Sequence, residues 1–570
     1  MVARRRLGHL RGAALGCAAG LIATAGLLAV HLVPAMLGAM TRGTVVVAAL
    51  ALAAGSLLVR PGPVPTRTGP ERPDPAPPPD QTRTAVLAAI ALGAVAINVL
   101  TFLRLNADVP ILHVDAVSFH LPDVATWIRD GSIWSNNEFI PQFPTGTYPS
   151  NGDVMFLAAA LPFHNDAFVR LVDLPFLGLL GLAVYALGVE LGAPRTLAAL
   201  FAAALLSIRA VTSFAVDQVV PDVVLLATLA AGALFLVRHF RTRRRAELVL
   251  AGVGLGIAFG SKWYGLSVVA VVLACWAVAS LLAGRGRRVV GRHGAALVGL
   301  VLACGGVWLL RNWVVTGNPL FPLKVELGGV AIFDAPRNVL LEQYGYTILD
   351  RVGQWSVWGD SILPDWRLAL GAPAALIGLL ATAGLVAVMR ARSTLGRRPA
   401  PDGTTAPPGA VASARTAAVP VAMLAAATLL VAAVYTITPA TSQGFASGPF
   451  RGLTGGNSRY VVPAFVLGAP VAAWLVARLG RLRPVAEVLA LLAVLDGLRV
   501  TFALSPGALA VTLLVLVALG RLGASLVTPA LRRKARRTRV LAAVASGLLA
   551  LAGLVALGNE LQERFNDDRY

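Results

Sequence analysis

Apolar runs of about 20 residues recur along this chain of 570 residues, and they constrain its fold more than any other feature. A helix of that length crosses the roughly 30 Å of hydrocarbon in a bilayer. Hydrophobic residues make up 57% of the sequence and charged residues 14%, which is too apolar for an ordinary soluble protein. We therefore expect an all-α polytopic membrane protein with about 13–15 transmembrane helices. The expected spans are 13–33, 43–59, 85–104, 166–189, 196–211, 220–238, 246–260, 264–283, 294–314, 368–389, 416–437, 460–477, 485–503, 507–526 and 540–558.

The distribution of charge in the loops predicts the topology. The net charge is +21, but the cations are gathered in alternate loops, so the charge indicates sidedness and not nucleic-acid binding. The other loops are acid-rich, above all 105–165 and 315–366. Basic loops face the cytoplasm, so we expect a multi-pass protein of the cell membrane with a cytoplasmic N-terminus and extracytoplasmic acidic loops. The basic loops are 238–245, 285–292, 390–398, 478–483 and 532–539.

Two segments rich in proline, glycine and small polar residues divide the chain. Residues 60–84 and 391–415 have the composition of extended cytoplasmic linkers. We therefore expect an N-terminal transmembrane hairpin at 1–59, a central transmembrane module at 85–390, and a C-terminal group of helices with an outer tail at 416–570.

The first acidic loop, 105–165, is too long for a passive connector. It opens with apolar residues at helical spacing and interleaved aromatics, which predicts helices lying along the membrane interface. Asp115 follows the outer end of the 85–104 span, where a carboxylate near a low-dielectric boundary can act as a general base. The alternative is that Asp115 caps the interfacial helix. The neighbouring histidines, His113 and His120, suit structural roles at the interface.

A second, shorter outer loop carries Asp217 and Asp222. Asp222 follows Pro221 at the start of a span, and an ionisable group at that depth is costly unless it is paired or solvated. Each aspartate is therefore a candidate functional residue. The alternative is an N-terminal cap that interacts favourably with the helix dipole.

Three cations are expected at the same membrane level as these acids. They are Lys262 in GSKWYG, Arg311 in RNWVVTGNPLFP, and Arg459, which precedes Tyr460 in GGNSRYVVP. Each alone is typical of a snorkelling interface anchor. Together they favour binding of a lipid-linked phosphate or pyrophosphate.

The glycines at 252, 256 and 260 recur every fourth residue, which predicts one helix face that allows close helix packing. The cysteines at 17, 275 and 304 lack the spacing of metal ligands. We therefore expect no metal-site residues, and the sequence indicates no particular cofactor. A divalent cation is compatible with the acidic loops, but nothing in them indicates one.

The order of these motifs resembles the GT-C superfamily of integral membrane glycosyltransferases. The series runs from Asp115 through HLPDVATWIRDGSIW and the Pro221–Asp222 pair to GSKWYG, RNWVVTGNPLFP and NSRYVVP. It is similar to the bacterial relatives of dolichyl-phosphate-mannose mannosyltransferases and lipid A aminoarabinose transferases. The resemblance covers about 85–325 and the short motif at 456–463.

The resemblance implies a GT-C-like core that takes a sugar from a polyprenyl-phosphate carrier and inverts the anomeric centre on the extracytoplasmic side. Asp115 matches the catalytic aspartate of the first loop, and Asp222 or Asp217 matches the acid of the second loop. Lys262 and Arg311 match cationic positions near the carrier phosphate. Ala116 follows Asp115 where a second acid would favour a divalent cation.

The sequence therefore leads to the hypothesis of an inverting glycosyltransferase of the bacterial cell envelope. Asp115 would be the general base, and Asp222 or Asp217 would orient the acceptor. The cations Lys262, Arg311 and Arg459 would hold the departing phosphate. The expected partners are the lipid-linked sugar donor, a glycan, lipid or protein acceptor, and membrane lipids. Residues that would contact substrate are His120, Trp127, Tyr264, Asn318 and Tyr460.

Two alternatives remain open at this stage. One is a transporter or flippase of lipid-linked sugars, which would need polar groups near the bilayer midplane. The other is a catalytically inactive membrane scaffold of the same fold.

Overall fold

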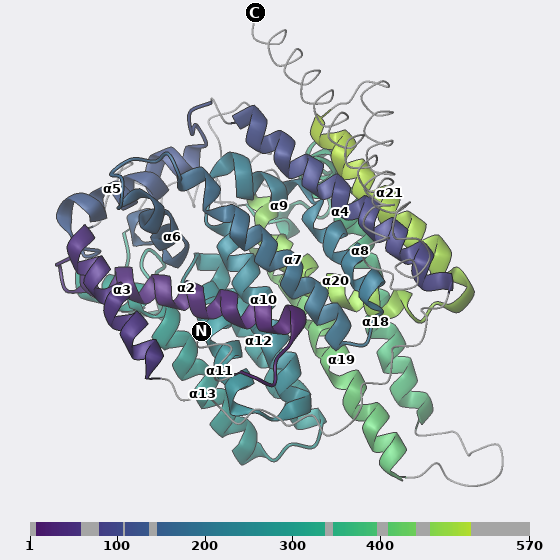
Figure 1. The fold of residues 1–570 in the computed structure, drawn as a ribbon. Helices are drawn as coiled ribbons and strands as arrows, with labels where there is room; N and C mark the ends of the chain where they lie inside the picture. Colours follow the sequence, from purple (N-terminus) through teal and green to yellow (C-terminus); the bar gives the residue numbers. More distant parts are fainter. Residues whose placement is uncertain are drawn as a thin grey trace, which may run out of the picture.

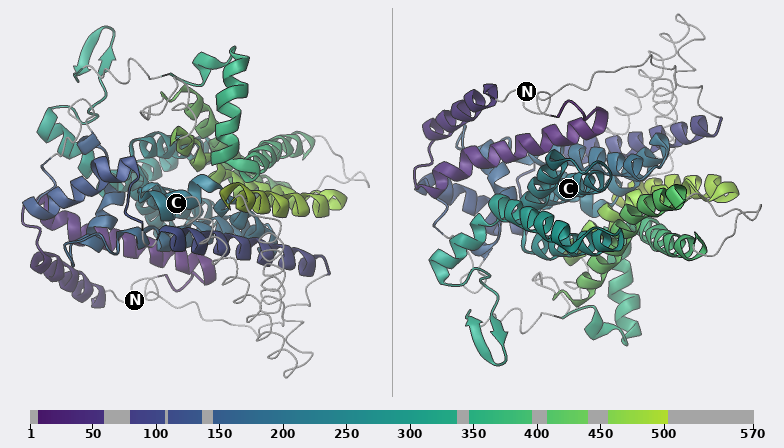
Figure 2. Two further views of the ribbon diagram at one scale, coloured as in Figure 1. Left: turned by 90° about the horizontal axis from the view of Figure 1, so that it is seen from above. Right: turned by 90° about the horizontal axis from the view of Figure 1, so that it is seen from below.

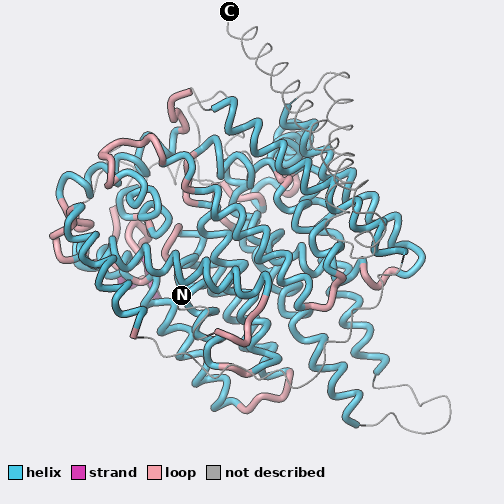
Figure 3. Tube along the Cα trace, in the orientation of Figure 1, coloured by secondary structure: helices cyan, strands magenta, loops and turns pink. Residues whose placement is uncertain are grey.

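The computed structural model describes residues 7–58, 79–106, 109–135, 145–336, 346–395, 408–439 and 456–502. Helices dominate this part of the chain (Figures 1 and 3). The expected class, an all-helical polytopic membrane protein, is confirmed.

Nine helices in the described ranges are long and apolar enough to cross a membrane, and a tenth crossing results if a pair bent by 71° counts as one span. That pair is α8 (Arg195–Leu206) with α9 (Arg209–Ser213). Each of the ten corresponds to an expected span. The nine helices are α2 (Gly12–Met36), α4 (Pro79–Asn106), α7 (Asp173–Glu190) with the preceding turn from Val169, α10 (Asp222–Thr242), α12 (Trp263–Leu282), α13 (Arg287–Gly305), α18 (Gly371–Leu395), α19 (Pro408–Ile437), and α20 (Val462–Val476) with the preceding turn from Asn457.

Three further expected spans form helices that are short or carry charged residues. Two are short: α3 (Arg42–Leu57) has 16 residues and α11 (Arg245–Phe259) has 15. The third, α21 (Arg483–Phe502), carries charged residues along its length. The expected spans 507–526 and 540–558 lie outside the described residues.

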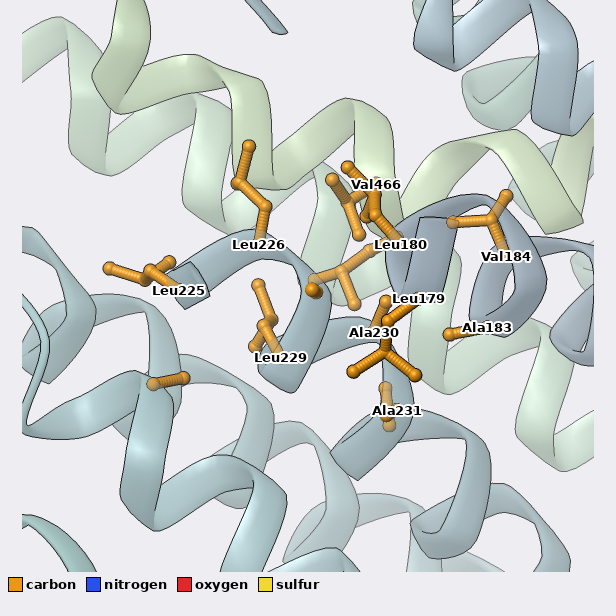
Figure 4. Close-up of a cluster of buried hydrophobic side chains, with 14 of the residues drawn as sticks. Leu179, Leu180, Ala183, Val184, Leu225, Leu226, Leu229, Ala230, Ala231 and Val466 are labelled. Atoms are coloured by element: carbon orange, nitrogen blue, oxygen red, sulfur yellow. The ribbon is translucent and has the colours of Figure 1, made fainter. Parts of the chain in front are cut away.

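Helix α10 forms the centre of the bundle. It is apolar on every face, which is typical of a helix surrounded by other helices, and 94% of its span is buried. It packs against α7, α11 and α20. Figure 4 shows Leu226 of α10 near Leu180 of α7 and Val466 of α20, all fully buried. This central packing fixes the N-terminus of α10, where Asp222 lies.

The glycine face predicted on α11 is confirmed, and it packs against α13. A Cβ atom added to Gly256 would lie 2.8 Å from Cβ of Cys304. One added to Gly252 would lie 2.6 Å from Cβ of Leu300. Real Cβ atoms do not approach so closely, so the two helix backbones meet only because the face lacks side chains.

The expected span 294–314 is wrong in its boundary. Helix α13 ends at Gly305, and a separate helix, α14 (Val307–Thr316), begins after Gly306. Two consecutive glycines weaken a helix, and Gly305 also lies against the backbone of Gly260. Arg311 is therefore a residue of α14 and not of the spanning helix.

The long loops fold into short elements at one end of the bundle. Loop 105–165 forms η1 (Ala116–His120), α5 (Leu121–Asp130) and α6 (Asn151–Ala160), which confirms the expected helices. Loop 315–366 contains an antiparallel hairpin of β1 (Val325–Leu327) and β2 (Val330–Phe333), which projects from the helical body (Figure 2). The remaining short helices are η2 (Thr145–Thr147), η3 (Val169–Leu171), η4 (Phe214–Gln218), η5 (Leu349–Arg351), α16 (Trp355–Val357), η6 (Trp358–Ile362), α17 (Leu363–Ala369), η7 (Gly456–Val461) and η8 (Gly480–Leu482).

The N-terminal and C-terminal helices both pack on the central helices. Helix α2 runs along one side of the bundle against α6 and α7 (Figure 2). Helix α20 packs on α7, α8 and α10, and α21 packs on α4. As a result, η7 at the start of α20 reaches the same end of the molecule as the loop that follows α4.

Candidate active site

Asp115 and Arg459 form an ion pair between the first long loop and η7. Arg459 Nη1 donates to Asp115 Oδ2 over 2.5 Å. The side chains of Asp115 and Arg459 are only 13% and 10% exposed. Asp115 makes no capping hydrogen bond to η1, although it immediately precedes that helix. The structure therefore does not support the alternative that Asp115 caps the interfacial helix.

Asp222 is engaged by two groups from the α11–α12 turn. Lys262 Nζ lies 2.7 Å from Asp222 Oδ2, and the Tyr264 hydroxyl donates to Asp222 Oδ1 over 2.7 Å. The Asp222 side chain is fully buried. Although it begins α10, the partners of its two oxygens are these side chains.

The two ion pairs belong to one electrostatic cluster. The charge of Lys262 acts on Asp115, and the charge of Arg459 acts on Asp222. Burial alone would raise the pKa of Asp115, but Arg459 and Lys262 outweigh it and hold that pKa well below its ordinary value. We call Asp115, Arg459, Asp222 and Lys262 the paired cluster.

Further buried polar groups surround the paired cluster. The carboxylate of Asp173, at the start of α7, interacts electrostatically with Asp222, Asp153 and Lys262, and its Oδ1 has no hydrogen-bond partner among the described residues. The carboxylate of Asp153 lies 2.7 Å from Nδ1 of His120 in a contact whose angles depart from those of a hydrogen bond. The charge of His120 in turn acts on Asp115.

Neither Asp153 nor Asp173 was a predicted site residue. A signal for Asp173 exists in the sequence, because it is a carboxylate within an expected span. Asp153 lies among other acids of a long loop, and nothing local distinguishes it. The close approach of Gly152 to Pro221 brings α6 and the start of α10 together here, since a Cβ at position 152 would overlap the proline ring.

Aromatic side chains border the cluster. The rings of Tyr264 and Tyr460 are 5.2 Å apart, and Arg459 lies 5.5 Å from the centre of the Tyr460 ring. Tyr148 is also buried here, and burial together with the charges of Tyr460 and Asp115 raises its pKa. Three aromatic rings therefore lie around the ion pairs.

An apolar crevice adjoins the two tyrosines. It lies between α12 and α19. Tyr264 and Tyr460 line it together with valines of both helices, including Val268 and Val434. Through Tyr264, which bonds to Asp222, the crevice adjoins the paired cluster.

Arg311 lies apart from the paired cluster. It is buried, donates to the carbonyl oxygen of Gly146, and lies over the Trp308 ring at 5.0 Å. Burial lowers the pKa of Arg311 to about 10, against the opposing charges of Asp123 and Asp153. These contacts join α14 to the first long loop.

The other predicted site residues have the following positions. Trp127 is buried in the core, with its ring 5.6 Å from that of Trp308. Asn318 donates to the carbonyl oxygens of Leu323 and Asp334 and so organises the loop after α14. Asp217 belongs to η4, and its side chain is outside the described part of the structure.

Within the described residues, no group of three or more His, Cys, Asp or Glu side chains has the arrangement needed to hold a metal ion.

A comparison with known protein families supports the resemblance that the sequence motifs indicated. Residues 120–313 match the family model for dolichyl-phosphate-mannose-protein mannosyltransferase. The resemblance to these GT-C membrane glycosyltransferases is therefore confirmed over that range, which includes Asp222 and Lys262 but neither Asp115 nor Arg459.

Two solved structures of ArnT from Cupriavidus metallidurans are also similar. The one bound to undecaprenyl phosphate is 17% identical, with a TM-score of 0.42 over 83% of this chain and 77% of that chain. The apo form is 16% identical, with a TM-score of 0.42 over 82% and 76%. No curated protein matches the chain.

Proposed function

We propose, from the match of residues 120–313 to the mannosyltransferase family, that this membrane protein is an inverting glycosyltransferase. It takes a sugar from a polyprenyl-phosphate donor and transfers it to a cell-envelope acceptor on the extracytoplasmic face. The observation that carries the proposal is the paired cluster, two buried carboxylate–cation pairs beside an apolar crevice.

The crevice and the cations suit the two halves of such a donor. A prenyl chain is apolar, and the valines of α12 and α19 offer it an apolar surface. A phosphate is anionic and binds best to buried cations that can donate charge-assisted hydrogen bonds, and Lys262 and Arg459 are such cations. Tyr264 lines the crevice and also contacts Asp222, so it connects the two parts.

The ion pairs suggest how donor binding prepares the site. Each candidate catalytic carboxylate is held by a candidate phosphate ligand: Asp115 by Arg459, and Asp222 by Lys262. A donor phosphate competes for the same two cations, because it offers more negative charge than one carboxylate. As Arg459 turns to the phosphate, Asp115 loses its counter-charge and becomes a stronger base.

The proposed reaction is a single displacement. Asp115 takes the proton of the acceptor hydroxyl, and the acceptor oxygen forms a bond to the anomeric carbon from the face opposite the leaving group. The bond between that carbon and the phosphate oxygen breaks, and polyprenyl phosphate departs with the bonding electrons. Lys262 and Arg459 stabilise its charge, and Asp222 orients the acceptor.

The orientation of the protein is part of the proposal. The paired cluster lies at the end of the bundle where the acid-rich loops gather, and the arginine-rich turns lie at the other end. A bias of lysine and arginine to one side favours the cytoplasm for the arginine-rich end. The active site would then open to the extracytoplasmic face.

The test is transfer from defined donors. Purified protein is incubated with a panel of polyprenyl-phosphate sugars and membrane acceptors, and the release of free polyprenyl phosphate is measured. We expect release with at least one donor and a product of inverted anomeric configuration. A transporter would instead move the intact donor between leaflets of a vesicle without releasing the carrier, and a scaffold would do neither.

A further inference from the structure

Glutamates pair with two groups of arginines at the end of the bundle opposite the paired cluster. Glu487 of α21 accepts from Arg83 over 3.1 Å and from Arg483 over 2.7 Å, and it is fully buried. Glu190 at the end of α7 accepts from Arg238 over 2.7 Å and from Arg241 over 2.8 Å. Each of these groups therefore has a carboxylate partner within the chain.

A third group of cations forms where the α10–α11 turn meets the α12–α13 turn. At its centre the rings of His239 and His293 lie 5.1 Å apart, with Nε2 of the first 3.4 Å from Nδ1 of the second. Arg285 donates to the carbonyl oxygen of Phe240 over 2.9 Å and lies 4.4 Å above its ring. Helices α11 and α13 pack side by side here (Figure 1).

Four arginines in or beside these two turns converge without a balancing acid among the described residues. The charges of Arg245, Arg285 and Arg292 all act on His293, and Arg243 acts on Arg285. Burial and the charge of Arg243 together lower the pKa of Arg285, as expected for cations forced together. We call Arg243, Arg245, Arg285 and Arg292 the arginine junction.

The nearest carboxylate is committed elsewhere. Glu247 also faces His239, but its Oε1 accepts from Arg238 over 3.2 Å and its Oε2 accepts from Thr242. Among the described residues, no carboxylate lies within ion-pair distance of any arginine of the junction. The junction therefore has a charge that an anion from outside the chain would balance.

The surface beside the junction is apolar. Val278 and Leu282 near the end of α12 are 55% and 68% exposed, and Val289 in the first turn of α13 is 43% exposed. In a membrane-spanning bundle such side chains face lipid tails. A ligand that fits both surfaces combines an anionic head with acyl chains.

We propose that the arginine junction binds the head group of an anionic phospholipid that carries two phosphates. Each of the two turns contributes two guanidinium groups, and a guanidinium binds phosphate through paired hydrogen bonds. A head group with two phosphates spans both turns and relieves the repulsion between them. Basic pockets between transmembrane helices are suited to such lipids. The proposal is independent of the glycosyltransferase activity.

The test uses the full-length protein, stripped of lipid in a neutral detergent. Cardiolipin, phosphatidylcholine and inorganic pyrophosphate are each titrated, and bound ligand is counted by native mass spectrometry while thermal unfolding is followed. We expect cardiolipin to bind at concentrations about tenfold lower than phosphatidylcholine. The double variant Arg285→Gln/Arg292→Gln should lose about tenfold in cardiolipin affinity, and the loss should shrink at high salt.

The matched control is Arg195→Gln, an exposed arginine at the start of α8 on the same end of the bundle. It should bind cardiolipin like the wild type. Because Arg285 also bonds to the Phe240 carbonyl, a second double variant, Arg243→Gln/Arg245→Gln, removes only exposed side chains and tests the junction if the first fails to fold. Equal binding by all variants, or equal losses in the control, would overturn the proposal. Stabilisation by pyrophosphate as strong as that by cardiolipin would overturn the lipid assignment.

Discussion

Arg459 Nη1 lies 2.5 Å from Asp115 Oδ2, although 344 positions separate the two residues in the chain. One is a candidate phosphate ligand and the other a candidate base, and both are largely buried. A helix near the C-terminal part of the chain therefore contributes to the same site as the first long loop. Because the two are paired, Arg459 can bind a phosphate only if it leaves Asp115. Asp115 can act as a base only once a competing anion draws Arg459 away.

The first prediction concerns the pH dependence of the proposed transfer. A carboxyl whose pKa lies below its ordinary value of 3.8 stays ionised, and its ion pair contributes stability, at any pH above that value. The contribution is lost only as the pH falls through the lowered pKa. Arg459→Gln removes the main opposing charge, so burial then raises the pKa of Asp115. Measured from pH 4 to pH 8, kcat/KM of the wild type should show no acid limb from Asp115, whereas the variant should show one because its pKa has risen into this range. A variant profile without an acid limb would show that Asp115 is not the group that titrates.

The second prediction concerns stability at the other pair. Lys262→Met leaves the buried Asp222 carboxylate without its counter-charge, which costs about 3–5 kcal/mol in unfolding free energy. The double variant Lys262→Met/Asp222→Asn should recover most of that loss but no transfer activity. Chemical denaturation in detergent measures the free energy of unfolding of both variants, and release of polyprenyl phosphate measures their transfer activity.

Lys324 provides the control for this cycle. It also lies 2.7 Å from a carboxylate, that of Glu326, but both side chains are about half exposed. Lys324→Met should leave the free energy of unfolding nearly unchanged, because exposed pairs contribute little. If the double variant at the buried pair were no more stable than Lys262→Met, the ion pair would not be the cause of the loss.

The third prediction tests the crevice as the site of the prenyl chain. Val434→Trp fills part of the space between α12 and α19. It should raise KM about tenfold for a long-chain donor and leave KM for a short-chain analogue unchanged, since only the long chain occupies the crevice. The control is Leu302→Trp on α13, which is exposed and does not line the crevice. Equal effects on both donors would argue against this position for the chain.

The fourth prediction concerns the close contact of α11 with α13. Gly256→Ala would bring a Cβ to 2.9 Å from Cα of Val301, and overpacking of this kind costs about 1–3 kcal/mol. Gly299→Ala on α13 meets nothing within 4 Å and should leave the melting temperature unchanged or slightly higher. Thermal unfolding of the two variants in the same detergent compares them directly. Equal melting temperatures would mean that the helices have room to separate.

The sequence predicts the helices well, because hydropathy over about 20 residues determines whether a segment can cross a bilayer. The sequence did not predict the break between α13 and α14 after Gly305, because the apolar pattern continues through the two glycines. Segments such as 507–526 lie outside the described residues and remain predictions.

The site was only partly predictable, because local sequence does not show which charges meet. Arg311 and Arg459 appear alike in the sequence, each next to an aromatic motif beside an expected span. In the structure only Arg459 reaches a carboxylate of the paired cluster, and Arg311 is buried against Gly146. The choice between capping and pairing for Asp115 likewise depends on a residue hundreds of positions away.

The central claim is that Asp115 acts as a base in transfer from a lipid-phosphate donor, and single-turnover release of polyprenyl phosphate tests it most directly. Donor binding and carrier release are measured for the wild type, Asp115→Asn and Asp130→Asn, the last removing an exposed carboxylate from the same loop. We expect Asp115→Asn to bind donor at least as tightly as the wild type, because Arg459 is no longer paired, but to release carrier at least about 100-fold more slowly. Asp130→Asn should match the wild type. Release by Asp115→Asn at the wild-type rate would contradict the account.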